Sequence, residues 1–294
     1  SPYRTFADPT VEIQSYFARV NFNLQDKYFL TATFRADGSN KFGKNNKYGY
    51  FPSVGAKWLI SNEEFLKNST VLSNLGLRAS WGITGNQEFP AGAALEQVTS
   101  SSYLSFSQTN TANPNLKWEK TTSVEVGLDY GFLNNRLTGS IDFYHKNTTD
   151  LLIQSFAIAP APPAAAYLNY PANLINTGVE FSIGAAVIEK KDFSWDLGFN
   201  IAYNHNILKN FNSAPIPTAQ VSGQGVSGTL AQVFTNNEPL NEYYLKKFSG
   251  YDQSGQQIIA DNPTFVGNPN PSVILGFSNT LRFKRLSFLM NFGG

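Results

Sequence analysis

The stretch from Leu174 to Tyr203 reads LINTGVEFSIGAAVIEKKDFSWDLGFNIAY and contains two long runs in which apolar and polar residues alternate. A period of two places the apolar side chains on one face of a β-strand and the polar ones on the other. Only residues 189–192 separate the runs, so the pattern predicts an antiparallel hairpin. Its apolar positions are Ile175, Val179, Phe181, Ile183, Ala185 and Val187, then Phe193, Trp195, Leu197, Phe199, Ile201 and Tyr203.

The length of these runs indicates where the hairpin lies. Strands of soluble domains usually have about 5 to 6 residues, whereas a strand that crosses a membrane needs about 9 to 11. Both runs reach the membrane-crossing length. Aromatic residues near strand ends are typical of the interfacial girdle of such proteins. We therefore interpret the hairpin as part of a transmembrane β-barrel.

The rest of the chain repeats this pattern. Alternation predicts further strands over residues 16–24, 28–37, 53–60, 75–84, 118–130, 137–143, 273–283 and 286–292. The strand over residues 118–130 starts with Trp118 on its apolar face. A small strand within a loop is expected around Tyr243 to Phe248. The segment from Ser61 to Ser69 is predicted to be a short helix that opens with a capping box. Short and long connections alternate, as in barrels with tight periplasmic turns and large external loops. The predicted fold class is all-β: a transmembrane antiparallel β-barrel segment of about ten strands with long extracellular loops.

Charged residues within the strands follow the polar parity. Because a lipid-facing Arg or Lys near mid-bilayer costs about 2 to 4 kcal/mol, this face is expected to be the lumen. Asn279 is an exception on the apolar parity. The residues expected to face the lumen are Arg19, Arg35, Arg78, Glu125, Glu180 and Asp196. Among them, Arg19, Arg35, Arg78 and Glu125 are the candidates to line a solute path. A ladder of salt bridges along the wall is the alternative role for them.

Composition excludes several other classes. The net charge of +1 offers no electrostatic reason to expect a nucleic-acid partner. Charged residues make up 15% of the chain, below the roughly 25% usual for soluble domains. Cysteine is absent, which removes disulfides and thiolate metal sites, and no cofactor or metal is expected. The chain begins at Ser1 without an initiator Met, so we expect it to be a piece of a longer polypeptide.

Several motifs occur in a characteristic order along almost the whole chain. They are Arg35-Ala36-Asp37-Gly38-Ser39, Lys41-Phe42-Gly43, Phe51-Pro52-Ser53-Val54, the segment from Leu77 to Gln87, Asn113-Pro114-Asn115-Leu116, Trp118-Glu119, Asn176-Thr177-Gly178-Val179-Glu180, Gly250-Tyr251-Asp252 and Gly267-Asn268-Pro269. In these motifs the chain resembles the SusC/RagA-like family of TonB-dependent outer-membrane transporters of the Bacteroidetes.

The resemblance implies an active nutrient importer in the cell outer membrane. Its barrel would have about 22 strands and a plug, would work with a SusD-like surface lipoprotein and TonB, and would import oligosaccharides or peptides without being an enzyme. Residues 1–294 would be a partial TonB-dependent-receptor β-barrel domain, with the plug domain and TonB box outside this chain. Long loops such as 85–116 and 206–271 offer amide and hydroxyl groups to a solute or contacts to the lipoprotein.

Three other functions remain compatible with the residues. A passive porin would share the same strand pattern and lumen. A soluble structural or adhesive β-domain would bury the apolar stripe instead of exposing it to lipid. A membrane-embedded hydrolase would need a histidine beside a serine and a carboxylate, and His145 and His205 are the only histidines.

Overall fold

The sheet that dominates the structure contains ten antiparallel strands. The structure, a computed structural model, describes residues 10–102, 105–156, 165–223 and 226–294. The strands follow the order β1-β2-β3-β4-β7-β8-β11-β12-β17-β18, which is also their order along the chain. Their bounds are β1 (Ile13–Leu24), β2 (Tyr28–Ser39), β3 (Tyr48–Leu59), β4 (Leu72–Asn86), β7 (Glu119–Phe132), β8 (Leu137–Thr149), β11 (Asn173–Lys190), β12 (Phe193–Lys209), β17 (Val273–Phe283) and β18 (Leu286–Gly293).

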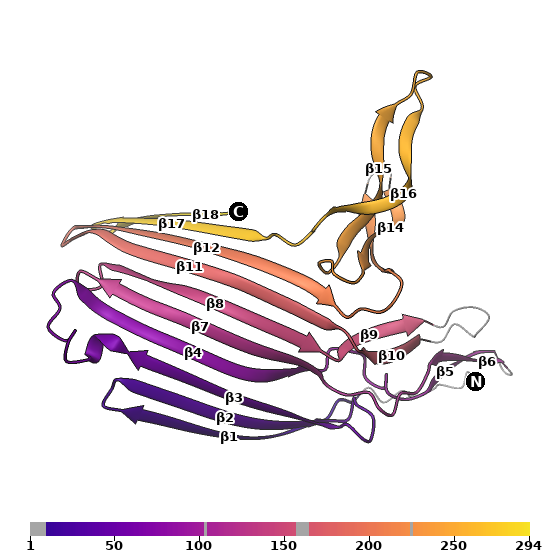
Figure 1. The fold of residues 1–294 in the computed structure, drawn as a ribbon, viewed down its shortest axis with the longest axis horizontal. Helices are drawn as coiled ribbons and strands as arrows, with labels where there is room; N and C mark the ends of the chain where they lie inside the picture. Colours follow the sequence, from indigo (N-terminus) through magenta and orange to yellow (C-terminus); the bar gives the residue numbers. More distant parts are fainter. Residues whose placement is uncertain (1–9, 103–104, 157–164, 224–225) are drawn as a thin grey trace. The chain divides into compact units, whose positions relative to one another are not determined.

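These ten strands confirm the ten that the alternation predicts. The chain divides into two compact units, residues 1–171 and 172–294. In the first unit β1 to β4, β7 and β8 run side by side, and in the second β11, β12, β17 and β18 do so (Figure 1). No helix in the described ranges is both long and apolar enough to cross a membrane.

The strands β11 and β12 form the predicted antiparallel hairpin, with one irregularity in the register. Phe181 lies opposite Ile201 in β12, and this regular pairing continues to Ala186. The register then shifts, so that Ile188 lies opposite Trp195. A β-bulge inserts one residue and reverses the parity beyond it. The pairing is regular up to the bulge, where Val187 has no opposite residue in β12, and Ile188 takes the apolar parity beyond it.

The apolar face of the sheet is exposed. Val126 in β7 has 43% of its surface accessible and Phe199 in β12 has 38%, while Phe181 is half-buried. Burial of these side chains is what a soluble sandwich requires. Their exposure fits a face turned toward lipid.

Short and long connections alternate as predicted except at β3–β4, where residues 60–71 form a longer connection than residues 40–47 between β2 and β3. The long connections contain more structure than expected. In the first unit β5 (Gln97–Ser102), β6 (Ser105–Asn110), β9 (Leu151–Phe156) and β10 (Ala165–Tyr170) form a four-stranded sheet. In the second unit β13 (Ile216–Gly223), β14 (Val226–Phe234), β15 (Glu242–Tyr251) and β16 (Gln257–Gly267) form another. Of these, only β15 corresponds to the loop strand predicted around Tyr243 to Phe248.

The predicted helix with a capping box is wrong. A 3₁₀ helix, η1, spans Ile60–Asn62 and is followed by hydrogen-bonded turns up to Ser69. Ser61 and Glu64, the two ends of the predicted capping box, do not cap a helix, because Ser61 lies inside η1 and no side chain caps it. The carboxylate of Glu63 accepts hydrogen bonds from Tyr28 Oη (2.6 Å), Trp58 Nε1 (3.1 Å) and Lys27 Nζ (3.1 Å). These bonds fasten the β3–β4 connection to the ends of β2 and β3.

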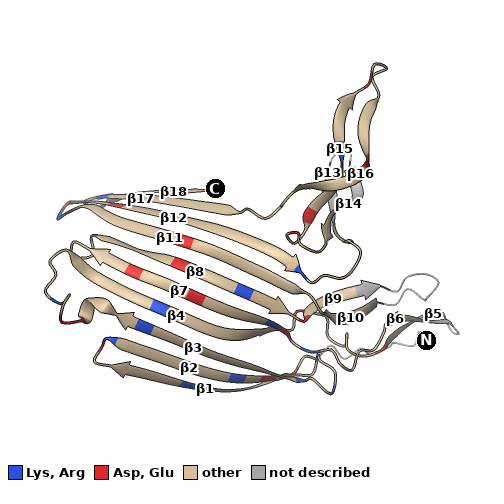
Figure 2. Ribbon diagram, viewed as in Figure 1, with Lys and Arg blue, Asp and Glu red and all other residues tan. Residues whose placement is uncertain are grey.

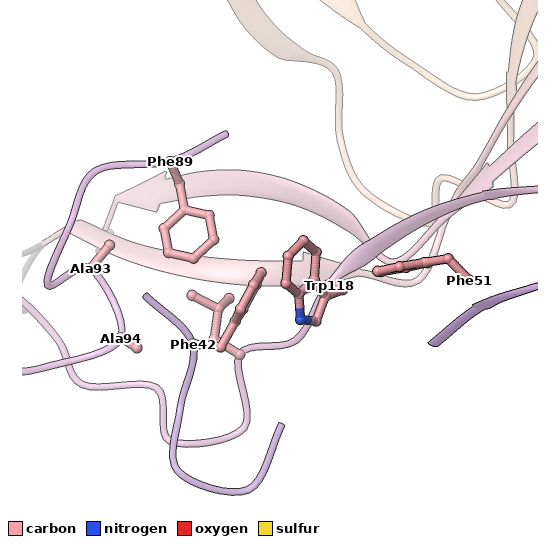
Figure 3. Packing of buried hydrophobic residues seen from close by; sticks show 7 residues of the cluster. Phe42, Phe51, Phe89, Ala93, Ala94 and Trp118 are labelled. Atoms are coloured by element: carbon pink, nitrogen blue, oxygen red, sulfur yellow. The ribbon is translucent and has the colours of Figure 1, made fainter. Parts of the chain in front are cut away.

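A buried aromatic cluster lies among the long connections of the first unit (Figure 3). The Trp118 ring lies 4.6 Å from that of Phe42 and 5.4 Å from that of Phe51, between centroids, and Phe89 packs on Phe42. Trp118 is 5% exposed and precedes β7, so its assignment to the lipid-facing stripe is wrong. Its Nε1 donates to the Lys47 carbonyl at 3.0 Å, which satisfies the buried indole.

A hydrogen bond explains why the polar residue Asn279 lies on the apolar face. Trp195 Nε1 donates a hydrogen bond to Asn279 Oδ1 at 2.7 Å, and both residues lie on the apolar parity of adjacent strands. An unpaired amide on this face would lose its hydrogen bonds with water. The indole compensates part of that loss.

Candidate functional site

The polar face of the first unit carries a ladder of four charged side chains from four adjacent strands. Lys57 Nζ in β3 lies 3.0 Å from Asp129 Oδ2 in β7, and Arg78 Nε in β4 lies 3.2 Å from Asp129 Oδ1. Arg78 also pairs with Asp142 in β8 through its Nη2. Figure 2 shows basic and acidic positions crossing β3, β4, β7 and β8. Two cations and two anions neutralise one another in this charge ladder.

Two glycines make the charge ladder possible. Gly127 lies between Arg78 and Asp142 in the register, and a Cβ there would overlap Asp142 Oδ1 and lie 2.7 Å from Arg78 Cζ. Gly76 lies opposite Asp129, and a Cβ at Gly76 would lie 3.1 Å from Lys57 Cε. Because neither glycine has a side chain, each long cation reaches across the intervening strand position.

Arg78 is among the residues predicted to face the lumen, whereas Asp129, which joins both cations, is not. All four members of the ladder lie on the polar parity, with glycines between them. That combination is the signal that could have identified the network. For Arg78, the structure thus shows the salt-bridge ladder that was the alternative to lining a solute path.

The other predicted residues form smaller pairs or stand apart. Arg35 Nε lies 2.6 Å from Asp37 Oδ2, and Arg19 Nε donates to Thr33 Oγ1 at 3.3 Å. Glu125 Oε1 lies 4.0 Å from Lys146 Nζ, the distance of a loose ion pair. These contacts place Arg19, Arg35 and Glu125 along the polar face but do not join them to the charge ladder.

The second unit contributes the last two predicted residues. Asp196 Oδ2 lies 3.0 Å from Arg282 Nη1 across β12 and β17. Glu180 is exposed, and within the described ranges no hydrogen bond or ion pair of its carboxylate is found. Partly exposed pairs such as Asp196–Arg282 contribute about 0 to 1 kcal/mol each, so their main effect is to cancel charge on the surface.

A hollow of about 460 Å³ lies on the polar side of the first unit, near the ends of β1 to β4 that lead into the long connections. Its walls combine hydroxyl, amide and charged groups with two aromatic rings. The lining residues are Ile13, Thr33, Arg35, Asp37, Phe51, Ser53, Ile83, Thr84, Gly85, Asn86, Gln87 and Trp118. Gln87 Oε1 is buried and accepts no hydrogen bond from the part of the chain that the structure describes. The hollow can therefore accept donors and acceptors from a polar solute.

The motifs noted in the sequence explain why the hollow holds its shape. Phe42, Phe51, Leu116 and Trp118 belong to motifs far apart in the chain, yet they share one buried cluster. A Cβ at Gly43 would overlap the backbone of Pro114, so this glycine lets two connections touch. The cluster fixes the long connections over the polar face.

The loop sheet of the second unit presents apolar side chains on its long hairpin. Phe248 and Tyr251 in β15 are 50% and 65% exposed and pack edge to face with centroids 5.3 Å apart. Ile258 and Ile259 in β16 are also exposed. At the base of this sheet Glu242 is buried, accepts the Gly267 N–H at 3.1 Å, and has a pKa raised by burial.

The two histidines lie on strands of the ten-stranded sheet. His145 in β8 lies opposite Val124, and His205 in β12 lies opposite Thr177, each on the apolar parity of its strand. The described part of the chain holds no group of three or more His, Cys, Asp or Glu residues placed to bind a metal ion.

Known proteins share both the sequence and this fold. The chain is 36% identical to the TonB-dependent receptor SusC of Bacteroides thetaiotaomicron, over 93% of the chain and 30% of that protein. It is 31% identical to the TonB-dependent receptor P26 of Formosa agariphila, over 96% of the chain and 32% of that protein. The solved structure of the RagAB peptide transporter superposes with a TM-score of 0.81 at 27% identity, covering 96% of the chain and 33% of that structure.

The chain thus spans about a third of the length of these relatives. A family model described as the β-barrel of TonB-dependent receptor-like proteins matches residues 1–283. The resemblance inferred from the motifs is confirmed by these matches. The chain belongs to the TonB-dependent receptor-like β-barrel family.

Proposed function

We propose that this chain is part of the wall of an energised outer-membrane importer of the SusC/RagA type, which carries oligosaccharides or peptides. The observation that carries the proposal is the polar face, on which charged side chains are largely neutralised by one another. A wall of this kind presents hydroxyl and amide groups without a strong field of one sign. Neutral polar solutes, such as sugars and peptide backbones, suit it better than highly charged ones.

Residues 1–294 are proposed to form a partial barrel domain, with the plug and the TonB-contacting segment in other parts of the protein. In the sheet order, β1 and β18 are the terminal strands. A free strand edge in lipid would leave backbone groups unsatisfied. We therefore expect both strands to pair with further strands of a larger barrel, in which Arg19, Arg35, Arg78, Glu125, Glu180 and Asp196 face the lumen.

A SusD-like lipoprotein is the proposed partner at the cell surface. The exposed apolar side chains of the β15–β16 hairpin, including Phe248, Tyr251, Ile258 and Ile259, support this proposal. Such residues in a long connection are suited to the apolar centre of a protein interface. The role is binding and translocation, and no enzymatic step is part of the proposal.

An uptake experiment tests the transport proposal. Cells that produce the protein and cells that lack it are given a fluorescent pool of glycan fragments or a fluorescent pool of peptides. One pool should accumulate only in the producing cells, and collapse of the proton gradient should stop its uptake. Uptake that survives the collapse would support a passive porin, and equal uptake by both cell types would refute transport of these solutes.

A substitution in the hollow locates the solute path more closely. Thr84→Val keeps the side-chain volume but removes one hydroxyl from the hollow. Loss of one hydrogen bond should reduce uptake by about 2- to 10-fold. Thr280→Val, on the polar parity of β17 and outside the hollow, is the matched control and should leave uptake unchanged. Equal effects of both substitutions would exclude the hollow from the path.

A further inference from the structure

Four basic side chains gather at the short turns of the second unit. Lys190 and Lys191 lie at the β11–β12 turn, and Lys284 and Arg285 form the β17–β18 turn. The Lys284 N–H donates to the Asp192 carbonyl at 2.9 Å, which holds the two turns together. Figure 2 shows basic positions at this end of β17 and β18. We call these four residues the basic turn patch.

The basic turn patch has an excess of positive charge. Glu189 and Asp192 are the acidic residues within the two turns. In the ranges that the structure describes, none of the four cations forms an ion pair.

The short connections of the first unit differ in this respect. There Lys27 pairs with Glu63 at 3.1 Å and Lys67 with Glu64 at 3.7 Å. The basic turn patch therefore keeps charge that is available to a ligand.

Apolar and aromatic residues border the patch directly. Phe283 and Leu286 pair across the β17–β18 turn and are 53% and 73% exposed. Trp195 on β12 lies on the same apolar parity, and Lys284 Nζ lies 5.5 Å from the centre of the Phe283 ring. In membrane proteins, aromatic side chains lie at the boundary between the hydrocarbon and the headgroup layer, and cations lie next to them among the headgroups.

We propose that the basic turn patch binds the phosphate headgroup of an anionic phospholipid in the periplasmic leaflet. The apolar border would contact the acyl chains, while the four cations meet the phosphodiester. Each Lys or Arg near an anionic membrane surface strengthens association by about fivefold. This inference requires the membrane placement shown by the family but does not depend on which solute is transported.

Spin-labelled lipids test the proposal on the whole protein reconstituted in phosphatidylcholine vesicles. The association constant of spin-labelled phosphatidylglycerol is measured relative to that of spin-labelled phosphatidylcholine, in about 0.1 M salt. The combined variant Lys190→Gln, Lys191→Gln, Lys284→Gln and Arg285→Gln should reduce the preference for phosphatidylglycerol at least tenfold. The shift of the folded barrel on unheated gels shows that the variant still folds.

The control variant removes four positive charges from positions outside the basic turn patch. Lys44, Lys47, Lys246 and Lys247 are exposed residues near the long connections, and their combined replacement by Gln should leave the lipid preference intact. Inorganic phosphate at matched ionic strength should not compete with the lipid. A wild-type protein without preference, a variant that keeps it, an equal loss in the control, or displacement by inorganic phosphate would each overturn the proposal.

Discussion

At the scale of single residues, glycines and charged side chains together determine the polar face. Arg78 reaches Asp142 because Gly127 leaves the intervening position empty, and Lys57 reaches Asp129 past Gly76. Alternation predicted on which face each cation lies. It could not predict which charged residues pair, because pairing depends on the register between strands and on the glycines that leave space between them.

The first prediction concerns Gly127. In Gly127→Ala the new Cβ would overlap Asp142 Oδ1 and press on the Arg78 guanidinium. We expect a loss of about 1 to 3 kcal/mol in the free energy of unfolding, measured by urea titration of the reconstituted protein. Gly55→Ala is the control, because its Cβ would meet Ser80 Cβ at an ordinary 3.8 Å. Equal stability of the two variants would show that the charge ladder does not depend on the missing side chain at Gly127.

The second prediction concerns Glu63 in the β3–β4 connection. Hydrogen bonds from Tyr28, then Trp58 and Lys27, hold the pKa of its carboxyl below the usual value. A carboxyl with a lowered folded-state pKa stabilises the fold above its unfolded pKa, and this stabilisation is lost as the pH falls through the folded value. At pH 7, Glu63→Gln should therefore lower the melting temperature. The difference from wild type should vanish in melting curves recorded well below pH 4, and a pH-independent difference would contradict this explanation.

At the scale of elements, a strand could be predicted where the alternation of apolar and polar residues continues over about seven residues or more, as at residues 137–143. The strand β5 escaped prediction because its sequence, QVTSSS, lacks an apolar stripe. The strand β9, LLIQSF, escaped because its apolar residues follow one another without regular alternation with polar ones. Trp118 fitted the apolar parity of β7, but tertiary contacts with Phe42 and Phe51 draw it into the aromatic cluster. Residues 157–164, which include the prolines Pro160, Pro162 and Pro163, lie outside the described ranges.

The hairpin of β11 and β12 supplies the third prediction. Glu180 and Phe181 are adjacent residues on opposite faces of β11. Phe181→Arg should destabilise the membrane-embedded protein by about 2 to 4 kcal/mol, because the cation would face lipid. Glu180→Arg should change the free energy of unfolding by less than about 0.5 kcal/mol, because position 180 faces water. The comparison uses urea unfolding in lipid vesicles, and similar losses for both variants would remove the distinction between the faces.

At the scale of the whole molecule, the family assignment and the physical pattern agree. Many apolar residues of the ten-stranded sheet are exposed, and several charged residues of its other face, such as Lys57, Arg78, Asp129 and Asp142, pair with one another. The sequence motifs located the parts that meet in the aromatic cluster, but the hollow beside it depends on connections that are remote in sequence. Its lining could therefore not be derived from alternation.

The central claim is that the apolar face meets lipid and the polar face meets water. It is tested by spin labels attached to single cysteines at Glu125, Val126, Phe199 and Asn200 in the membrane-reconstituted protein. Labels at Val126 and Phe199 should be relaxed mainly by oxygen, which dissolves in lipid, and labels at Glu125 and Asn200 mainly by a water-soluble nickel chelate. The reverse pattern, or the same accessibility at neighbouring positions, would contradict the account.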